Sequence, residues 1–263
     1  MFNTHNKLFS FIFPNMNYTL KNKRALVTGG SRGIGAAIVK RLASEGADVA
    51  FTYTNSPDQA NEIVQAAQAL GVQALAIQAN SAEASALVAA VEQTVDKLGG
   101  IDILVNNAGV LAIAPLNDFT LADFDRTIAI NVRAVFVATQ AAVKHMQEGG
   151  RIINIGSTNA ERMPFAGGGV YAMSKSALQG LVQGLARDLG PRGITINNVQ
   201  PGPIATEMNP PDTEFAQMLK SQFMALPRYG TVEEVAGMVA YLAGPEASFI
   251  TGASLMIDGG FSA

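Results

Sequence analysis

The chain of 263 residues contains no cysteine and no tryptophan, and its two histidines are His5 and His145. Without cysteine, disulfide bonds, thiolate metal sites and cysteine nucleophiles are excluded. Neither histidine stands in a metal-ligand pattern, so a zinc centre or a catalytic triad that depends on histidine is not expected. The predicted site therefore contains no metal.

Charge is also sparse: 15% of the residues are charged, 48% are hydrophobic, and the formal net charge is −3. This balance is typical of a globular protein with a well-buried core, and it argues against nucleic acid or an anionic membrane as a partner. The apolar run Leu8–Phe13 is too short to span a membrane, and Pro14 breaks it before any small-residue cleavage site. We therefore expect residues 1–20 to be a flexible extension without a targeting role, Met16 to be a natural alternative start, and the protein to be cytoplasmic.

Short apolar segments alternate with longer amphipathic segments along the rest of the chain. The predicted strands are Arg24–Thr28, Asp48–Tyr53, Gln73–Gln78, Ile101–Asn106, Arg151–Ile155, Ile194–Val199 and Ser254–Ile257. The predicted helices are Ile34–Ser44, Asp58–Leu70, Ala82–Leu98, Leu121–Gln147, a helix that carries Tyr171 and ends at Gly190, Thr213–Ala225 and Thr231–Ala243. This alternation forms βαβ units, which predicts an α/β fold with a parallel sheet covered on both faces. No linker divides the chain, so residues 21–263 are predicted to form one domain.

A glycine-rich loop, TGGSRGIG, follows the first predicted strand. In a doubly wound sheet this is the place where a dinucleotide binds. Gly29 permits a tight turn, Gly33 lets the backbone approach a pyrophosphate, and Gly35 allows the next helix to pack closely on the strand. The N–H groups at the start of that helix then face the phosphates. The loop therefore predicts a dinucleotide cofactor, with further contacts from Ser31, Arg32 and Ile34.

Tyr171 and Lys175 are four residues apart and so lie on one face of a helix. An ammonium group there favours the phenolate and is expected to lower the pKa of the tyrosine from about 10 toward the working pH. A hydroxyl from another segment, that of Ser157, can hydrogen-bond a carbonyl oxygen while the tyrosine gives or takes its proton. This is the acid–base half of the interconversion of a carbonyl and an alcohol. A Tyr-x-x-x-Lys pair by itself is also common on helix surfaces.

Together these motifs make the chain similar to the short-chain dehydrogenase/reductases, in the subgroup that also contains 3-oxoacyl carrier-protein reductases. The glycine loop has the spacing T-G-x-x-x-G-x-G rather than G-x-G-x-x-G. The other matching motifs are Asn106-Asn107-Ala108-Gly109, Asn131, Ser157, Tyr171 with Lys175, and Pro201–Thr206, in the order that the family expects. The resemblance runs from about Lys21 to the C-terminus. It implies a single-domain, Rossmann-like doubly wound sheet of about seven strands in the order 3-2-1-4-5-6-7.

The resemblance also implies what these residues do. Tyr171 would protonate the carbonyl oxygen during reduction, Lys175 would lower the pKa of Tyr171 and bind the nicotinamide ribose, and Ser157 would polarise the carbonyl. Asn131 would hold a water molecule that connects the lysine to solvent, and Asn106 would stabilise the central sheet. The implied cofactor contacts beyond the glycine loop are Asn107, Ala108, Gly109, Tyr171, Lys175, Pro201, Gly202, Ile204 and Thr206.

The end of the second strand predicts which nicotinamide cofactor binds. NAD-specific folds place an acid there, which binds the ribose 2′-hydroxyl. Here the segment is Tyr53-Thr54-Asn55-Ser56, and no acid occurs before Asp58. Hydroxyl and amide groups can bind a 2′-phosphate, and Arg32 can supply positive charge, which favours NADP(H). Asn80 stands where the family often has an aspartate that contacts adenine.

The predicted substrate pocket consists of Ser157, Asn159, Met163, Phe165 and Met208, under a largely apolar lid near residues 207–225. The preferred interpretation is an NADPH-dependent reductase of a ketone, diketone or aldehyde, acting on the CH–OH/C=O pair. One alternative is a 3-oxoacyl-carrier-protein reductase. Another is a nucleotide-binding regulator, because the chain also resembles, in Gly156–Asn159 and Pro245–Gly252, a branch named for cyclic-di-GMP binding and biofilm dispersal. The resemblance further implies a homotetramer.

Overall fold

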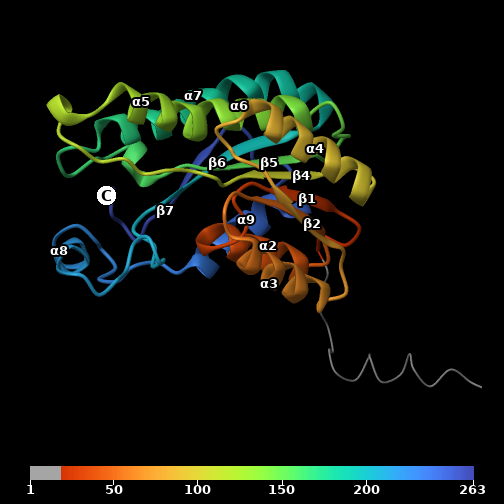
Figure 1. The fold of residues 1–263 in the computed structure, drawn as a ribbon, viewed down its shortest axis with the longest axis horizontal. Coiled ribbons are helices and arrows are strands. Elements are labelled where there is room, and N and C mark those ends of the chain that lie inside the picture. Colours follow the sequence, from red (N-terminus) through yellow and green to blue (C-terminus); the bar gives the residue numbers. More distant parts are fainter. Residues whose placement is uncertain (1–18) are drawn as a thin grey trace, which may run out of the picture.

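The computed structural model describes residues 19–263, which form a seven-stranded parallel sheet (Figure 1). The strand order β3-β2-β1-β4-β5-β6-β7 confirms the predicted fold. The strands are β1 (Arg24–Val27), β2 (Asp48–Tyr53), β3 (Ala74–Gln78), β4 (Ile103–Asn106), β5 (Arg151–Ile155), β6 (Thr195–Pro201) and β7 (Ser254–Ile257). All six neighbouring pairs are parallel, so the carboxyl ends of the strands meet at one edge of the sheet. Open sheets of this kind bind ligands at that edge.

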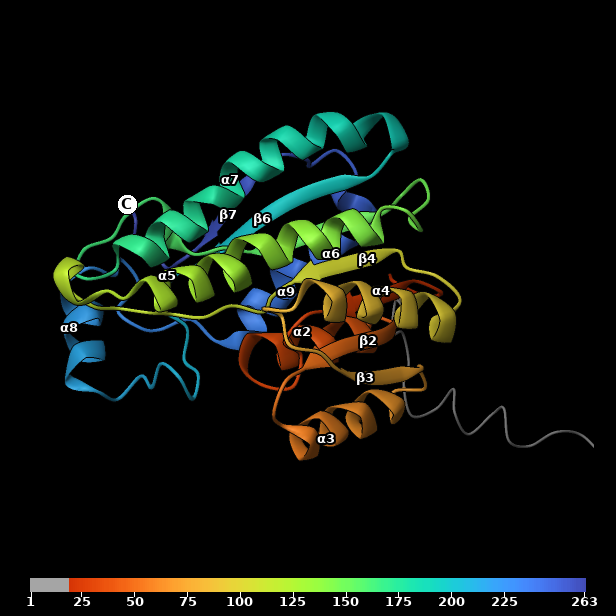
Figure 2. The same cartoon turned by 45° about the horizontal axis from the view of Figure 1, so that its top comes forward.

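Helices cover both faces of the sheet (Figure 1). One layer contains α2 (Gly33–Ser44), α3 (Pro57–Gln68) and α9 (Val232–Ala243). The other layer contains α4 (Ala84–Leu98), α5 (Leu121–Ile128), α6 (Ala134–Ala142) and α7 (Gly169–Leu189). Helix α8 (Glu214–Gln222) stands apart from both layers, on the same side of the molecule as the C-terminus (Figure 2). Short 3-10 turns occur at Leu116–Asp118, Thr158–Ala160, Gly190–Arg192 and Pro245–Ala247.

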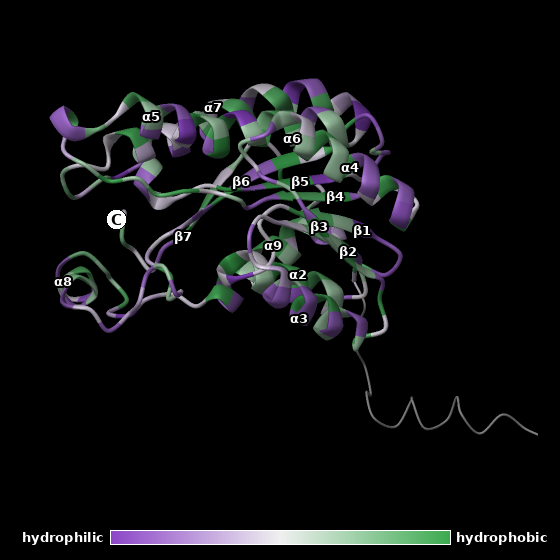
Figure 3. Cartoon of the chain, viewed as in Figure 1, coloured by the Kyte–Doolittle hydropathy of each residue, from purple (hydrophilic) through white to green (hydrophobic). Residues whose placement is uncertain are grey.

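The central strands are buried on both faces, which explains their nearly continuous apolar runs. Successive side chains point to opposite faces, so Val105 packs in the core beneath α2 and α9, whereas Leu104 packs in the core beneath α4 and α6. Figure 3 shows β4 and β5 as mostly hydrophobic, while α3 and α4 carry both hydrophilic and hydrophobic residues. Two separate cores therefore hold the sheet between its helical layers.

The folded domain begins slightly earlier than the sequence indicates. Residues 1–18, which include Leu8–Phe13 and Met16, lie outside the described residues. Leu20 is buried in the core, and its N–H donates to the carbonyl oxygen of Glu45 at 3.0 Å. The last residue of the expected extension is therefore part of the fold.

The region predicted as one long helix, Leu121–Gln147, is interrupted and shorter. It consists of α5, a π turn at Ala129–Arg133, and α6, which ends at Ala142. The prediction of an unbroken helix to Gln147 was wrong, because a change from i→i+4 to i→i+5 hydrogen bonds has no distinctive sequence signal. Such turns are rare and are often found at functional sites. The turn contains Asn131, whose side chain is buried.

The described residues contain neither a membrane-spanning helix nor a cluster of metal-binding side chains. No helix within residues 19–263 is both long and apolar enough to cross a bilayer. The same part of the chain holds no group of three or more acidic or histidine side chains that could bind a metal ion. The remaining candidate for a functional site is the carboxyl edge of the sheet.

Candidate active site

The glycine loop between β1 and α2 has a backbone that requires glycine. Gly29 and Gly33 have φ angles of +67° and +55°, in the left-handed region that other residues rarely adopt. A Cβ atom on Gly35 would lie 2.1 Å from the carbonyl oxygen of Gly29. The turn therefore closes tightly against the start of α2, as the sequence predicted.

Side chains from β2 and from the end of β4 hold this loop in place. The amide nitrogen of Asn107 donates to the carbonyl oxygens of Thr28 at 2.9 Å and of Gly29 at 3.0 Å. The Thr28 hydroxyl accepts the N–H groups of Asn107 and Ala108, each at 3.0 Å. The hydroxyl of Thr52, in β2, accepts the N–H of Gly29 at 3.0 Å. Asn107, predicted as a cofactor contact, thus uses both amide hydrogens to shape the loop.

The polar groups predicted to select NADP(H) over NAD lie at the end of β2. Thr54 and Asn55 are exposed, and Tyr53 and Ser56 are half-buried. Arg32 caps α2 with extended backbone, is exposed, and makes none of the ion pairs found within residues 19–263. The side-chain carbonyl oxygen of Asn80 accepts the N–H of Ala82 at 3.0 Å, and the residue is exposed. An exposed cation and several hydroxyl and amide groups therefore flank one end of the glycine loop.

Four residues predicted to take part in catalysis come together from separate elements. Ser157 follows β5, Asn131 lies in the π turn, and Tyr171 and Lys175 occupy the first two turns of α7. The Lys175 Nζ lies 5.9 Å from the centroid of the Tyr171 ring. A Cβ atom on Gly109 would lie 3.4 Å from Lys175 Nζ and 3.5 Å from Asn131 Oδ1. Gly109 therefore lies directly beside both groups, within van der Waals contact of where a Cβ atom would stand.

Asn131 joins the π turn to the loop after β4 and to α7. Its carbonyl oxygen accepts the N–H of Val110 at 2.9 Å, and its amide donates to the Val110 carbonyl at 2.9 Å. The same amide donates to the Ser174 hydroxyl at 3.0 Å, and that hydroxyl donates to the carbonyl oxygen of Tyr171 at 2.7 Å. The side chain therefore positions the helix that carries Tyr171.

Burial changes the titration of both residues of the Tyr171–Lys175 pair. It raises the pKa of Tyr171 above its usual value, and the neighbouring Ser157 hydroxyl offsets this shift only in part. It lowers the pKa of Lys175 to about 8. The predicted lowering of the Tyr171 pKa by the lysine is therefore wrong for the protein groups by themselves. The ammonium donates to the carbonyl oxygen of Ile155 at 2.8 Å instead of to the phenol.

The hydroxyl of Ser157 is oriented by a local turn. It accepts the N–H of Asn159 at 3.1 Å and donates to the Asn159 side-chain carbonyl at 3.2 Å. The Asn159 amide donates in turn to the Arg162 carbonyl at 3.2 Å and to the sulfur of Met163 at 3.6 Å. Three predicted pocket residues thus belong to one hydrogen-bonded loop.

Several apolar side chains belong to the segments predicted to form the pocket and its lid. The rings of Phe165 and Phe215 meet edge to face, with centroids 5.5 Å apart and planes at 78°. This contact links the loop before α7 to α8, which belongs to the predicted lid. Met208 is 75% exposed, and Leu111 and Ile113 are exposed as well. Exposed apolar side chains therefore lie on the segments that flank this loop.

Two contacts with the loop that contains Ser157 could not be predicted from the sequence. The Thr158 hydroxyl donates to the carboxylate of Asp258 at 2.9 Å, across 100 residues of sequence. Arg162 donates to the carbonyl oxygens of Phe261 at 3.0 Å and Ala263 at 3.3 Å. Contacts of such long sequence separation leave no local pattern that could reveal them.

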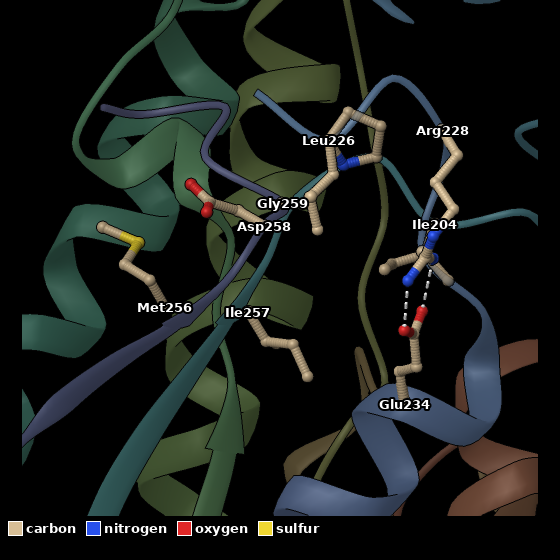
Figure 4. A pocket seen from close by; sticks show the side chains of 10 residues that line it. Ile204, Leu226, Arg228, Glu234, Met256, Ile257, Asp258 and Gly259 are labelled. Carbon is tan, nitrogen blue, oxygen red and sulfur yellow. Dashed lines mark hydrogen bonds and ion pairs between the residues drawn. The ribbon is translucent and has the colours of Figure 1, made fainter. Parts of the chain in front are cut away.

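A cavity of about 510 Å³ lies near the end of β7 (Figure 4). Figure 4 shows Arg228 and Glu234 paired on one side of it and Met256 and Asp258 on the other. The residues that line it are Pro203, Ile204, Leu226, Arg228, Gly230, Glu234, Met256, Ile257, Asp258 and Gly259. None of the four residues predicted to act in catalysis is among them. The cavity is thus distinct from the reacting groups and shares Ile204 with the predicted cofactor contacts.

The sheet order, the glycine loop at the carboxyl edge and the adjacent Ser–Tyr–Lys group define the dinucleotide-binding class of α/β proteins. A family model described as Enoyl-(Acyl carrier protein) reductase matches residues 29–262. The chain belongs to the short-chain dehydrogenase/reductase family, whose members are oxidoreductases.

Relatives of known description align along nearly the whole described chain. The Cyclic-di-GMP-binding biofilm dispersal mediator protein of Escherichia coli (strain K12) is 52% identical over 241 residues, which cover 92% of this chain and 98% of the relative. A solved short-chain dehydrogenase/reductase from Serratia marcescens BCRC 10948 is 64% identical, with a TM-score of 0.92, covering 93% of this chain and 100% of that one. A short-chain dehydrogenase from Burkholderia cenocepacia J2315, solved in complex with NADP, is 55% identical, with the same TM-score and coverage.

Proposed function

We propose that the protein is an NADPH-dependent carbonyl reductase that converts a ketone, diketone or aldehyde to an alcohol. The observation that carries this proposal is the convergence of Ser157, Tyr171 and Lys175 beside the glycine loop. A serine hydroxyl, a tyrosine proton donor and a cofactor loop are the parts that carbonyl reduction requires. We expect all of them within one domain, residues 21–263, whose lid is near residues 207–225.

The residues of the loop fit a dinucleotide. Glycine at positions 33 and 35 leaves a backbone cradle that a side chain would strain or fill, and the N-terminus of α2 faces it. Arg32 and the hydroxyl and amide groups after β2 suit a 2′-phosphate better than an acid would. The Burkholderia relative was solved with NADP, which supports the same choice. When bound, the nicotinamide supplies the hydride.

The chain itself supplies and controls the proton. Tyr171 stays protonated at neutral pH because burial raises its pKa, and a protonated phenol is the form that a reductase needs. Its proton passes to the carbonyl oxygen of the substrate, while the Ser157 hydroxyl hydrogen-bonds and orients that oxygen. The side chain of Asn131 bonds Val110 and Ser174 and so positions α7, and we propose that the same residue also holds the water for proton resupply.

The central test is the variant Tyr171→Phe, assayed by NADPH oxidation against a panel of diketones, aldehydes and acetoacetyl thioesters. Loss of the proton donor should lower kcat by about 10²–10⁴-fold. The dissociation constant for NADPH, measured by titration of nicotinamide fluorescence, should change little because the hydroxyl is the only group removed. Turnover retained by this variant would remove Tyr171 from the proposed role.

A 3-oxoacyl-carrier-protein reductase is the second candidate, because relatives of that description in Synechocystis sp. and Staphylococcus aureus are 41% and 38% identical to this chain. Arg126, Arg133 and Lys144 are exposed and could contact an acidic carrier protein. Acetoacetyl thioesters on a carrier protein should then be reduced with a far lower KM than free diketones. Equal KM values would favour the small-molecule reductase.

A regulatory nucleotide site is the third candidate, and it follows from the name of the Escherichia coli relative. Cyclic-di-GMP binding, measured by calorimetry with and without saturating NADPH, tests it directly. Tight binding of cyclic-di-GMP together with no turnover of any carbonyl would favour a sensor over an enzyme.

We also propose that the protein is cytoplasmic and assembles as a homotetramer. Phe249 is fully exposed, and Phe136 of α6 and Tyr241 of α9 are close to half exposed. Aromatic side chains are enriched in the interfaces between subunits, and a tetramer would cover some of these. Light scattering during gel filtration should give four times the mass of the chain, and a monomer mass would exclude the tetramer.

A further inference from the structure

The last six residues of the chain, Asp258–Ala263, contact three segments predicted to serve the active site. We call these residues the C-terminal clasp. The clasp follows β7 directly and ends among the loop after β5, the loop after β6 and the region of α8. Figure 4 shows its first residue, Asp258, at the end of β7.

The first contact joins Asp258 to the residue that follows Ser157. The Thr158 hydroxyl donates to Asp258 Oδ2 at 2.9 Å. The same oxygen accepts the N–H of Ser262 at 3.0 Å and its hydroxyl at 2.6 Å, and Oδ1 accepts the N–H of Gly260 at 3.0 Å. Burial opposes ionisation of Asp258, but these hydrogen bonds outweigh it and lower its pKa. A charged carboxylate thus folds the clasp and holds Thr158.

The second contact joins the end of the clasp to Arg162, which lies between Ser157 and Tyr171. The guanidinium group donates to the carbonyl oxygens of Phe261 and Ala263. It also lies over the ring of Phe223, 5.7 Å from the centroid, where it makes a cation–π contact. The loop that carries Ser157 is therefore attached to the clasp at two points.

The third contact places the clasp beneath the lid. Phe261 is buried and packs with Leu219 of α8 and with Phe223, whose ring centroid is 6.2 Å from its own. The N–H of Leu226 donates to the carbonyl oxygen of Gly259 at 2.9 Å. A Cβ atom on Gly260 would lie 2.5 Å from Cβ of Ala225, so the two segments pack closely. The position of the lid depends on these contacts.

The clasp also touches the loop predicted to hold the nicotinamide. A Cβ atom on Gly202 would lie 2.7 Å from Cα of Asp258. The N–H of Gly202 donates to the carbonyl oxygen of Ile257 at 3.1 Å. Glycine at position 202 is thus required by the approach of Asp258, and one residue adjoins both the serine loop and the cofactor loop.

We propose that the C-terminal clasp positions the catalytic serine and the lid, with Asp258 as a positioning residue that acts through Thr158. The proposal rests on the function proposed above. Because the Ser157 hydroxyl must meet the substrate oxygen within hydrogen-bond distance, release of Thr158 lets the serine turn move and slows the chemical step. None of the hydrogen bonds that hold the glycine loop involves Thr158 or Asp258, so release of Thr158 should leave NADPH affinity near that of the parent chain.

The decisive variant is Thr158→Val, which removes the hydroxyl without changing the size of the side chain. Its kcat should fall by about tenfold to a hundredfold, with NADPH affinity within about twofold of the parent chain. Thr158→Ser keeps the hydroxyl and serves as the matched control, which should recover most of the activity. The kcat of the double variant Thr158→Val/Asp258→Asn should be no lower than that of Asp258→Asn. The reason is that both substitutions remove the same hydrogen bond. Independent losses, or no loss in Thr158→Val, would overturn the proposal.

A second measurement keeps the proposal separate from the proposed function. Deletion of residues 261–263 should speed hydrogen exchange in residues 157–162 and 214–226 but leave residues 24–36 unchanged. This result would support the clasp even if no carbonyl were reduced by the full chain. Unchanged exchange in both segments would overturn the clasp while leaving the reductase proposal standing.

Discussion

The two ends of the sheet's carboxyl edge are built in different ways. Around β1, β2 and β4, the glycine loop is held by backbone groups and by short side chains such as Thr28 and Thr52. Around β5, β6 and β7, charged side chains hold loops that are about 100 residues apart in sequence, as Asp258 holds Thr158 and Arg162 holds the end of the clasp. The first region ends in a tight glycine turn, whereas the second region is flanked by exposed apolar side chains such as Met208 and Leu111.

This difference matches the two ligands that we propose: one cofactor of constant structure and a substrate that varies among related enzymes. A dinucleotide presents the same phosphates to every enzyme that uses it, so a fixed backbone cradle suits it. Substrates differ, and loops joined by side chains can change shape and chemistry without disturbing the sheet. We therefore expect substitutions in the first region to lower the affinity for the cofactor. Substitutions in the second region should alter turnover and substrate specificity.

The largest effect should come from breaking the cradle with Gly35→Ala. The added methyl group would lie 2.1 Å from the Gly29 carbonyl oxygen, so the loop or α2 must shift. NADPH affinity should fall by about a hundredfold or more because the phosphate-binding N–H groups move with them. Calorimetry with NADPH measures the change.

The matched control is Gly184→Ala, in the interior of α7, where no atom lies within 4 Å of the new Cβ. There alanine should stabilise the helix by about 0.5–1 kcal/mol and leave NADPH affinity unchanged. Similar losses of affinity in both variants would show that the cradle is not sterically defined.

An effect of intermediate size is expected for Lys175→Met. This variant should gain stability although it loses a residue proposed to act in catalysis. Burial lowers the pKa of Lys175 to about 8 from 10.5, so its charge destabilises the fold fully below pH 8, and this cost disappears as pH rises toward 10.5. The shift corresponds to about 3 kcal/mol. The methionine variant should be more stable at pH 7 by about 1–3 kcal/mol, since the lost hydrogen bond to Ile155 offsets part of the gain.

Urea unfolding of this variant at pH 7 and pH 10 measures the difference, which should shrink at the higher pH. Lys40→Met, at an exposed position on α2, is the control and should change stability little at either pH. In the parent chain, carbonyl reduction that depends on the ammonium should decline as pH rises through about 8. A rate that stays constant to pH 10 would contradict a role for the charged lysine.

The smallest effect should come from Phe215→Ala, which removes the edge-to-face contact with Phe165. An aromatic pair of this kind contributes about 0.5–1.5 kcal/mol, so KM for an apolar ketone should rise by a few-fold to about tenfold. NADPH affinity should not change. Phe215→Leu keeps most of the apolar surface, so its KM should lie between those of the parent chain and the alanine variant. A change confined to NADPH affinity would contradict the division into two regions.

Local sequence was sufficient to predict the glycine loop of the first region and the strands around it. The alternation of strands and helices and the resemblance it supports predicted the strand order, and the spacing of Gly29, Gly33 and Gly35 predicted a loop that the backbone angles confirm. These features depend on neighbouring residues, because a turn and a helix start are formed within a few residues. For the same reason, the roles of Asn107 and Asp258 could not be derived: their partners come from other elements.

The sequence by itself determined the α/β architecture, the cofactor loop, and the identity of the serine, tyrosine and lysine expected to act together. Only the tertiary structure decided that Asn131 lies in a π turn, that burial raises the pKa of Tyr171, and that the chain's last residues adjoin Ser157. The physical reason is the range of each effect. Backbone conformation depends on adjacent residues, whereas desolvation and long-range hydrogen bonds exist only after distant segments have packed together.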